Sequence, residues 1–69
     1  MNTKQIDYAL ELAQVKNFNR AAENLFIFQP SLSYQIQALE SEIGLALFLR
    51  SGRGAEVTPA GEQFFQTLR

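Results

Sequence analysis

The sequence predicts one small, mainly α-helical domain with a two-stranded β-hairpin near its C-terminal end. Three observations lead to this expectation. Apolar residues recur at helical spacing over three successive segments, the spacing changes to alternation after Gly44, and a Thr-Pro pair then begins a fourth helix. The length of 69 residues allows a single core, which buries only about 60% of the surface of the unfolded chain.

The first two predicted helices span residues 4–16 and 20–25. Asn2 or Thr3 is expected to cap the first helix and Asn19 the second, because short polar side chains accept hydrogen bonds from free N–H groups at helix starts. Both segments place small or apolar residues on one face. These residues are Ile6, Ala9, Leu10 and Ala13 in the first helix, and Ala21, Ala22 and Leu25 in the second.

A third helix is predicted from about residue 29 to residue 43. Pro30 fits its first turn, where a proline leaves no hydrogen bond unmade, and Gly44 fits its C-terminal end, where left-handed backbone is common. The helical period separates an apolar face from an uncharged polar one. The apolar face consists of Leu32, Ile36, Leu39 and Ile43, and the opposite face of Pro30, Tyr34, Gln37 and Ser41.

The remaining chain predicts a β-hairpin followed by a fourth helix. Residues 55–58 alternate in polarity, and together with residues 47–50 they flank a turn of sequence SGRG, which is typical of two strands joined by a tight loop. Two helices joined by a short turn and followed by a hairpin form a winged helix-turn-helix. We therefore predict a winged helix-turn-helix domain over residues 1–58 and the start of a further helix over residues 59–69.

The composition excludes several classes of function. The chain has no Cys and no His, which rules out disulfides, Cys/His zinc sites and nucleophilic catalysis by these residues. It has no phosphate-binding glycine loop and no carboxylate pair with an evident pocket, so we expect no enzyme activity, metal or cofactor. No apolar run approaches the ~20 residues of a membrane span. We expect a cytoplasmic protein.

The charge pattern points in two directions. A net charge of −1 and a pI near 5.2 argue weakly against nucleic acid, because a basic patch is the usual footprint. However, none of the residues between Glu23 and Glu40 is charged, so no acid near the start of the third helix would repel a phosphate. Gln and Ser side chains on such a face match the donors and acceptors of base edges. Taken alone, the neutral face fits a merely solvated surface equally well.

A more specific signal comes from four segments taken together: RAAENL (20–25), QPSLSYQIQALE (29–40), GLALFLR (44–50) and VTPAGE (57–62). In order and spacing they resemble the N-terminal DNA-binding domain of LysR-type transcriptional regulators. The match covers essentially the whole chain. The resemblance implies sequence-specific binding to duplex DNA by one part of a longer regulator, whose C-terminal effector-binding domain is absent from this sequence.

The resemblance also implies which residues contact DNA. Four positions match family residues that contact bases or backbone in the major groove: Gln29, Pro30, Ser33 and Tyr34. Arg53 matches a wing residue that reaches the minor groove, and the glycines at 52 and 54 would let the backbone approach DNA closely. The alternatives are a solvated turn charge for Arg53 and a carboxylate partner for Arg50. The complete expected set is Gln29, Pro30, Ser31, Ser33, Tyr34, Gln37, Arg50 and Arg53.

Three positions depart from the family's pattern and bear on the target sequence rather than on the fold. Tyr34 stands where Arg is common, so a phenol replaces a phosphate or guanine contact. Phe28 stands where a Ser or Thr commonly caps the third helix, and a missing cap costs ~0.5–2 kcal/mol. Ala9 stands where a large aromatic residue is common. We expect Phe26 or Phe28 to fill part of that space.

The fourth helix predicts how the protein assembles. Its apolar side is expected to contain Phe64, Phe65 and Leu68. No stop signal precedes Arg69, so we expect the sequence to end within the linker helix that the family uses for dimerisation. The resemblance implies a palindromic or pseudo-palindromic operator and a full-length homodimer or higher homo-oligomer. This fragment alone is expected to be monomeric or to dimerise weakly.

The main alternative function is a winged helix that contacts another protein instead of DNA. The acidic pI supports this alternative, and Tyr34 and Phe28, if exposed, would serve as an aromatic anchor. Salt dependence separates the two functions, because phosphate contacts weaken steeply as salt rises. We take sequence-specific DNA binding in transcriptional regulation as the expected function.

Overall fold

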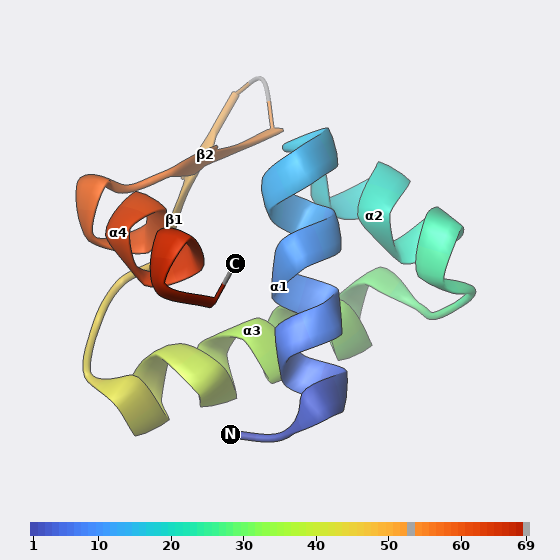
Figure 1. Ribbon diagram of the computed structural model, residues 1–69. Helices are drawn as coiled ribbons and strands as arrows, with labels where there is room; N and C mark the ends of the chain where they lie inside the picture. The colour runs from blue at the N-terminus through green and yellow to red at the C-terminus, as the bar shows by residue number, and fades with distance from the viewer. Residues whose placement is uncertain (53, 69) are drawn as a thin grey trace.

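The computed structural model describes residues 1–52 and 54–68 and has the predicted winged helix-turn-helix architecture (Figure 1). In chain order the elements are α1 (Thr3–Val15), α2 (Phe18–Leu25), α3 (Gln29–Ile43), β1 (Phe48–Ser51), β2 (Gly54–Val57) and α4 (Pro59–Leu68). The two strands pair antiparallel and form the wing. In Figure 1, α1 runs between α2 on one side and the wing with α4 on the other. Among the described residues, no helix has both the length and the apolar character needed to cross a bilayer.

The starts of α1 and α2 follow from short polar side chains, with one correction to the prediction. Asn2 caps α1 as expected, and its Oδ1 accepts a hydrogen bond from the third helical N–H at 2.8 Å. The predicted cap of α2 at Asn19 is wrong, because Asn17 caps this helix and its Oδ1 accepts from Arg20 N at 2.9 Å. The earlier start places Phe18 in the first turn, where it is buried in the core. Burial of this aromatic ring therefore favours Asn17 over an equally good local cap two residues later.

A single core joins the helices and the wing. The predicted inward face of α3 is confirmed for Leu32, Ile36 and Leu39, while Ile43 is only partly buried. The buried apolar residues are Ala9, Leu12, Phe18, Ala21, Ala22, Leu32, Ile36, Leu39, Leu47, Phe48, Ala55 and Phe65. Since these come from every element, the position of the wing relative to α3 is fixed by packing and not by the turn alone.

The space next to Ala9 is not filled in the way the sequence suggested. Phe26 and Phe28 are 93% and 82% exposed, so the expectation that either ring packs near Ala9 is wrong. The preceding turn of α1 instead buries Gln5, whose Nε2 donates to Gln35 Oε1 of α3 at 3.2 Å. A polar contact between α1 and α3 therefore lies one turn from the position where the family commonly has a large aromatic residue.

The wing is attached at two points. Glu40, near the end of α3, accepts hydrogen bonds through Oε2 from Leu47 N at 2.7 Å and Phe48 N at 3.1 Å. On the other strand, Ala55 N donates to Lys16 O at 2.9 Å. Gly54 makes this approach feasible, because it has φ 124° and an added Cβ would lie 2.5 Å from the same carbonyl oxygen.

The fourth helix begins as predicted, but one of its two aromatic residues is buried in the core of the domain. Thr58 Oγ1 accepts from Gly61 N at 2.9 Å, and Pro59 occupies the first helical position. Phe65 is 2% exposed and its ring centroid lies 5.8 Å from that of Phe48. Phe65 is thus a core residue of this chain, which leaves Phe64 and Leu68 as the more accessible of the three expected dimer contacts. Phe64 is partly buried against the same core, and Leu68 remains 41% exposed.

Candidate nucleic-acid interface

The turn from α2 to α3 orients the predicted recognition helix. Phe26 ends α2 in a left-handed conformation with φ 58°, and Ile27 N donates to Ala22 O at 3.0 Å. Phe28 occupies the N-cap position of α3 without a side-chain hydrogen bond, which confirms the missing cap expected from the sequence. Pro30 follows in the first turn, where its lack of an N–H has no cost.

The exposed face of α3 is uncharged over its first two turns. Tyr34 is 69% exposed, and Gln37 one turn later is also exposed. Gln29 and Ser33 are partly buried because they lie on the flank that faces β1. The remaining expected residues of this face, Pro30 and Ser31, are exposed. The structure therefore places Pro30, Tyr34 and Gln37 on one exposed face of α3, with Gln29 and Ser33 on its flank toward β1 and Ser31 on the other flank.

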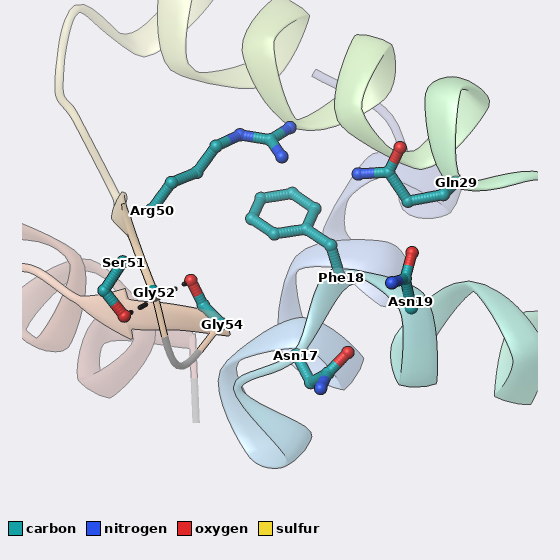
Figure 2. Close-up of a pocket in the computed structure, with 8 residues that line it drawn as sticks. All are labelled: Asn17, Phe18, Asn19, Gln29, Arg50, Ser51, Gly52 and Gly54. Carbon is teal, nitrogen blue, oxygen red and sulfur yellow. Dashed lines mark hydrogen bonds between the residues drawn. The ribbon is translucent and has the colours of Figure 1, made fainter.

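Arg50 connects the wing to this face of α3. Its guanidinium carbon lies 3.9 Å from the centroid of the Phe18 ring, and its Nη2 donates a hydrogen bond to Ser33 Oγ. Gln29 Nε2 donates to the same oxygen at 2.9 Å. Figure 2 shows the guanidinium above the ring and the Gln29 amide nitrogen turned toward them. Within residues 1–52 and 54–68 Arg50 makes no ion pair. Its partners are the Phe18 ring and the Ser33 hydroxyl, and not the carboxylate that the alternative interpretation of Arg50 required.

These residues border a polar groove between α2, α3 and the wing (Figure 2). No described lining residue is acidic, and the cationic Arg50 lies along one side. Two amides that the sequence reasoning missed, Asn17 and Asn19, lie at the start of α2 on the opposite side. The sequence pattern Asn-Phe-Asn could have indicated them, because it places two polar side chains on either side of one buried ring. The lining residues are Asn17, Phe18, Asn19, Gln29, Arg50, Ser51, Gly52 and Gly54.

The two glycines at the tip of the wing differ in their surroundings. Gly54 is required by its contact with the carbonyl of Lys16, so its presence does not depend on DNA. Gly52 is exposed, and an added Cβ there would meet nothing within 4 Å. Arg53, expected to reach the minor groove, lies outside the described residues.

Comparison with known proteins agrees with this architecture. The family model for bacterial regulatory helix-turn-helix proteins of the lysR family matches residues 3–62. The regulator BudR of Raoultella terrigena is 49% identical over 65 residues, which is 94% of this chain but 22% of BudR. The chain spans from 20% to 46% of the length of the curated relatives compared with it.

Two solved structures resemble the chain closely. A complex of the CbnR DNA-binding domain with DNA superposes with a TM-score of 0.92 at 39% identity, covering 97% of this chain and 77% of that domain. A complex of the BenM DNA-binding domain with benA site 1 DNA gives a TM-score of 0.90 at 39% identity, covering 97% and 75% respectively. From the family match and the shared fold, the chain belongs to the lysR family of bacterial regulatory helix-turn-helix proteins.

Proposed function

We propose that this chain is the sequence-specific DNA-binding domain of a LysR-type transcriptional regulator, with α3 in the major groove of duplex DNA. The observation that carries the proposal is the uncharged, exposed leading face of α3, flanked by the cationic Arg50. An α-helix fits the major groove, where every base pair presents a distinct set of donors and acceptors. The CbnR and BenM domains, which share this fold, were each solved in complex with DNA.

The proposed roles follow the position of each side chain. Gln29, Ser33 and Tyr34 read base edges, because they occupy the leading turns of α3. The exposed phenol of Tyr34 stacks on a base or bonds one acceptor where an arginine would hold a phosphate. Three further α3 residues position the helix on the backbone or extend the reading face: Pro30, Ser31 and Gln37. Arg53 enters an A·T-rich minor groove from the wing tip, where a narrow groove attracts arginine.

Assembly is proposed to occur through the fourth helix. Residues 1–58 form the DNA-binding unit, and residues 59–69 begin a linker helix that pairs two copies of the protein. The apolar surface that supports this role contains Phe64, Leu68 and the neighbouring Leu45, which is 42% exposed. A two-fold dimer would bind a palindromic or pseudo-palindromic operator in the cytoplasm. No catalytic role is proposed.

Selection of bound sequences from random duplex DNA tests the proposed function. We expect an enriched motif, and we expect the affinity for that motif to fall steeply as salt rises, because bound phosphates release counterions. Arg53→Ala should reduce the salt slope by about one unit. If no motif is enriched and salt has little effect, the protein-contact alternative replaces the proposal.

A further inference from the structure

The hydroxyl of Ser33 lies between two hydrogen-bond donors. Gln29 Nε2 donates to it from the preceding turn of α3 at 2.9 Å, and Arg50 Nη2 donates to it from β1. A serine hydroxyl has two acceptor lone pairs and one O–H donor. Both lone pairs are therefore engaged, and among the described residues none accepts a hydrogen bond from this O–H.

The donor nearest the wing cannot reverse its role. A guanidinium has five N–H donors and no acceptor. Its position is held by the ring of Phe18, which lies 3.9 Å below and is itself buried in the core. The strand that carries Arg50 is fixed in turn by the two backbone bonds to Glu40. Three elements thus hold Ser33 with its lone pairs facing inward.

We propose that Ser33 is a dedicated hydrogen-bond donor in base recognition, and that Arg50 is the positioning residue that makes it one. This inference rests on the proposed function, since it specifies the chemistry of the base that Ser33 faces. An unconstrained serine accepts from cytosine or adenine amino groups as readily as it donates. With its lone pairs engaged, Ser33 requires an acceptor: a purine N7, guanine O6 or thymine O4. The cytosine amino group is rejected at that position.

Atom replacement in the selected duplex tests the donor role. Analogues that lack one purine N7, guanine O6 or thymine O4 are placed singly at each position, and affinity is measured for the unmodified protein and for Ser33→Ala. At one position the unmodified protein should lose about 3- to 10-fold, the size of a single neutral hydrogen bond. Ser33→Ala should lose nothing further there. Ser41→Ala, an exposed serine at the far end of α3, is the matched control and should behave like the unmodified protein.

If Ser33→Ala remains as sensitive as the unmodified protein at every such position, Ser33 donates to no base acceptor and the proposal fails. If no motif is enriched in the selection, the proposed function fails, and the inference fails with it. If a motif is enriched but no single acceptor deletion weakens binding of the unmodified protein, the donor role of Ser33 fails while the proposed function stands. A thermal melt of each variant confirms that the comparison is made between folded proteins.

The role of Arg50 is tested separately with Arg50→Met, which keeps an apolar stem over Phe18 but removes the donor. One lone pair of Ser33 becomes free, so repeated selection should now enrich cytosine together with the original bases at the Ser33 position. The salt slope should change by well under one unit, as for the control Arg20→Ala, whose side chain is exposed on α2. A slope lower by a full unit would make Arg50 a phosphate contact and would overturn its assignment as a positioning residue.

Discussion

The two ends of α3 use their polar side chains for different purposes. At the leading end, residues 29–37 carry no charge, and Ser33 accepts hydrogen bonds from Gln29 and Arg50 beside an exposed tyrosine. At the trailing end, the carboxylate of Glu40 binds the two N–H groups where β1 begins. An acid at the leading end would repel a phosphate, whereas at the trailing end it holds the wing. In the proposed function, one helix therefore separates recognition from scaffolding along its length.

Among the contacts that hold the wing in place, the one at Gly54 should be the most sensitive to substitution. Gly54→Ala should lower the free energy of unfolding by about 2–3 kcal/mol, because a backbone with φ 124° is strained for alanine and the new Cβ meets Lys16 O. A domain of this size should then melt roughly 10–20 °C lower. Gly52→Ala is the control, since nothing lies near its added Cβ, and its melting temperature should be unchanged. Equal melting of the two variants would contradict the attachment of β2 to α1.

The trailing end of α3 is tested by Glu40→Ala. Two backbone N–H groups at the start of β1 lose a charged acceptor, so the protein should be destabilised by about 1–3 kcal/mol in a thermal or denaturant melt. Glu42→Ala changes an exposed carboxylate two residues away and should cost about 0.5 kcal/mol or less. If the two substitutions cost the same, the carboxylate of Glu40 does not hold the wing.

The leading end should be open to stabilisation, because its helix lacks a cap. Phe28→Ser supplies an acceptor for the first N–H groups of α3, and since Phe28 is 82% exposed no core contact is lost. Unfolding free energy should rise by about 1 kcal/mol. Phe28→Ala removes the same ring without adding an acceptor and should give no such gain. A fall in stability for both variants would mean that the ring is packed in solution.

Local rules predicted the order of the elements and most of their ends to within one residue. Asn2, Gly44 and the Thr58–Pro59 pair stand where helix capping requires them, and each does what its residue type predicts. The start of α2 was missed because Asn17 and Asn19 are equal as local caps. Burial of the intervening Phe18, a tertiary effect, decides between them.

The candidate site could be predicted only in part. The residues of α3 follow from helical periodicity and the resemblance, because both depend on sequence neighbours. The partners of Arg50 do not, since Phe18 and Ser33 lie in other elements and meet it only after the wing has docked. For the same reason the burial of Phe65 against Phe48 was not visible in the pattern of α4, which looks the same for a core residue and a dimer contact.

The most direct test of the division along α3 compares one substitution at each end. The ratio of affinities for the selected duplex and a scrambled duplex is measured for the unmodified protein, Tyr34→Ala and Ser41→Ala. We predict that Tyr34→Ala lowers this ratio by an amount equivalent to ~1–3 kcal/mol, the discrimination of a good base contact, and that Ser41→Ala leaves it unchanged. A Tyr34→Ala protein that binds both duplexes more weakly by the same factor would contradict the assignment of the leading end to base reading.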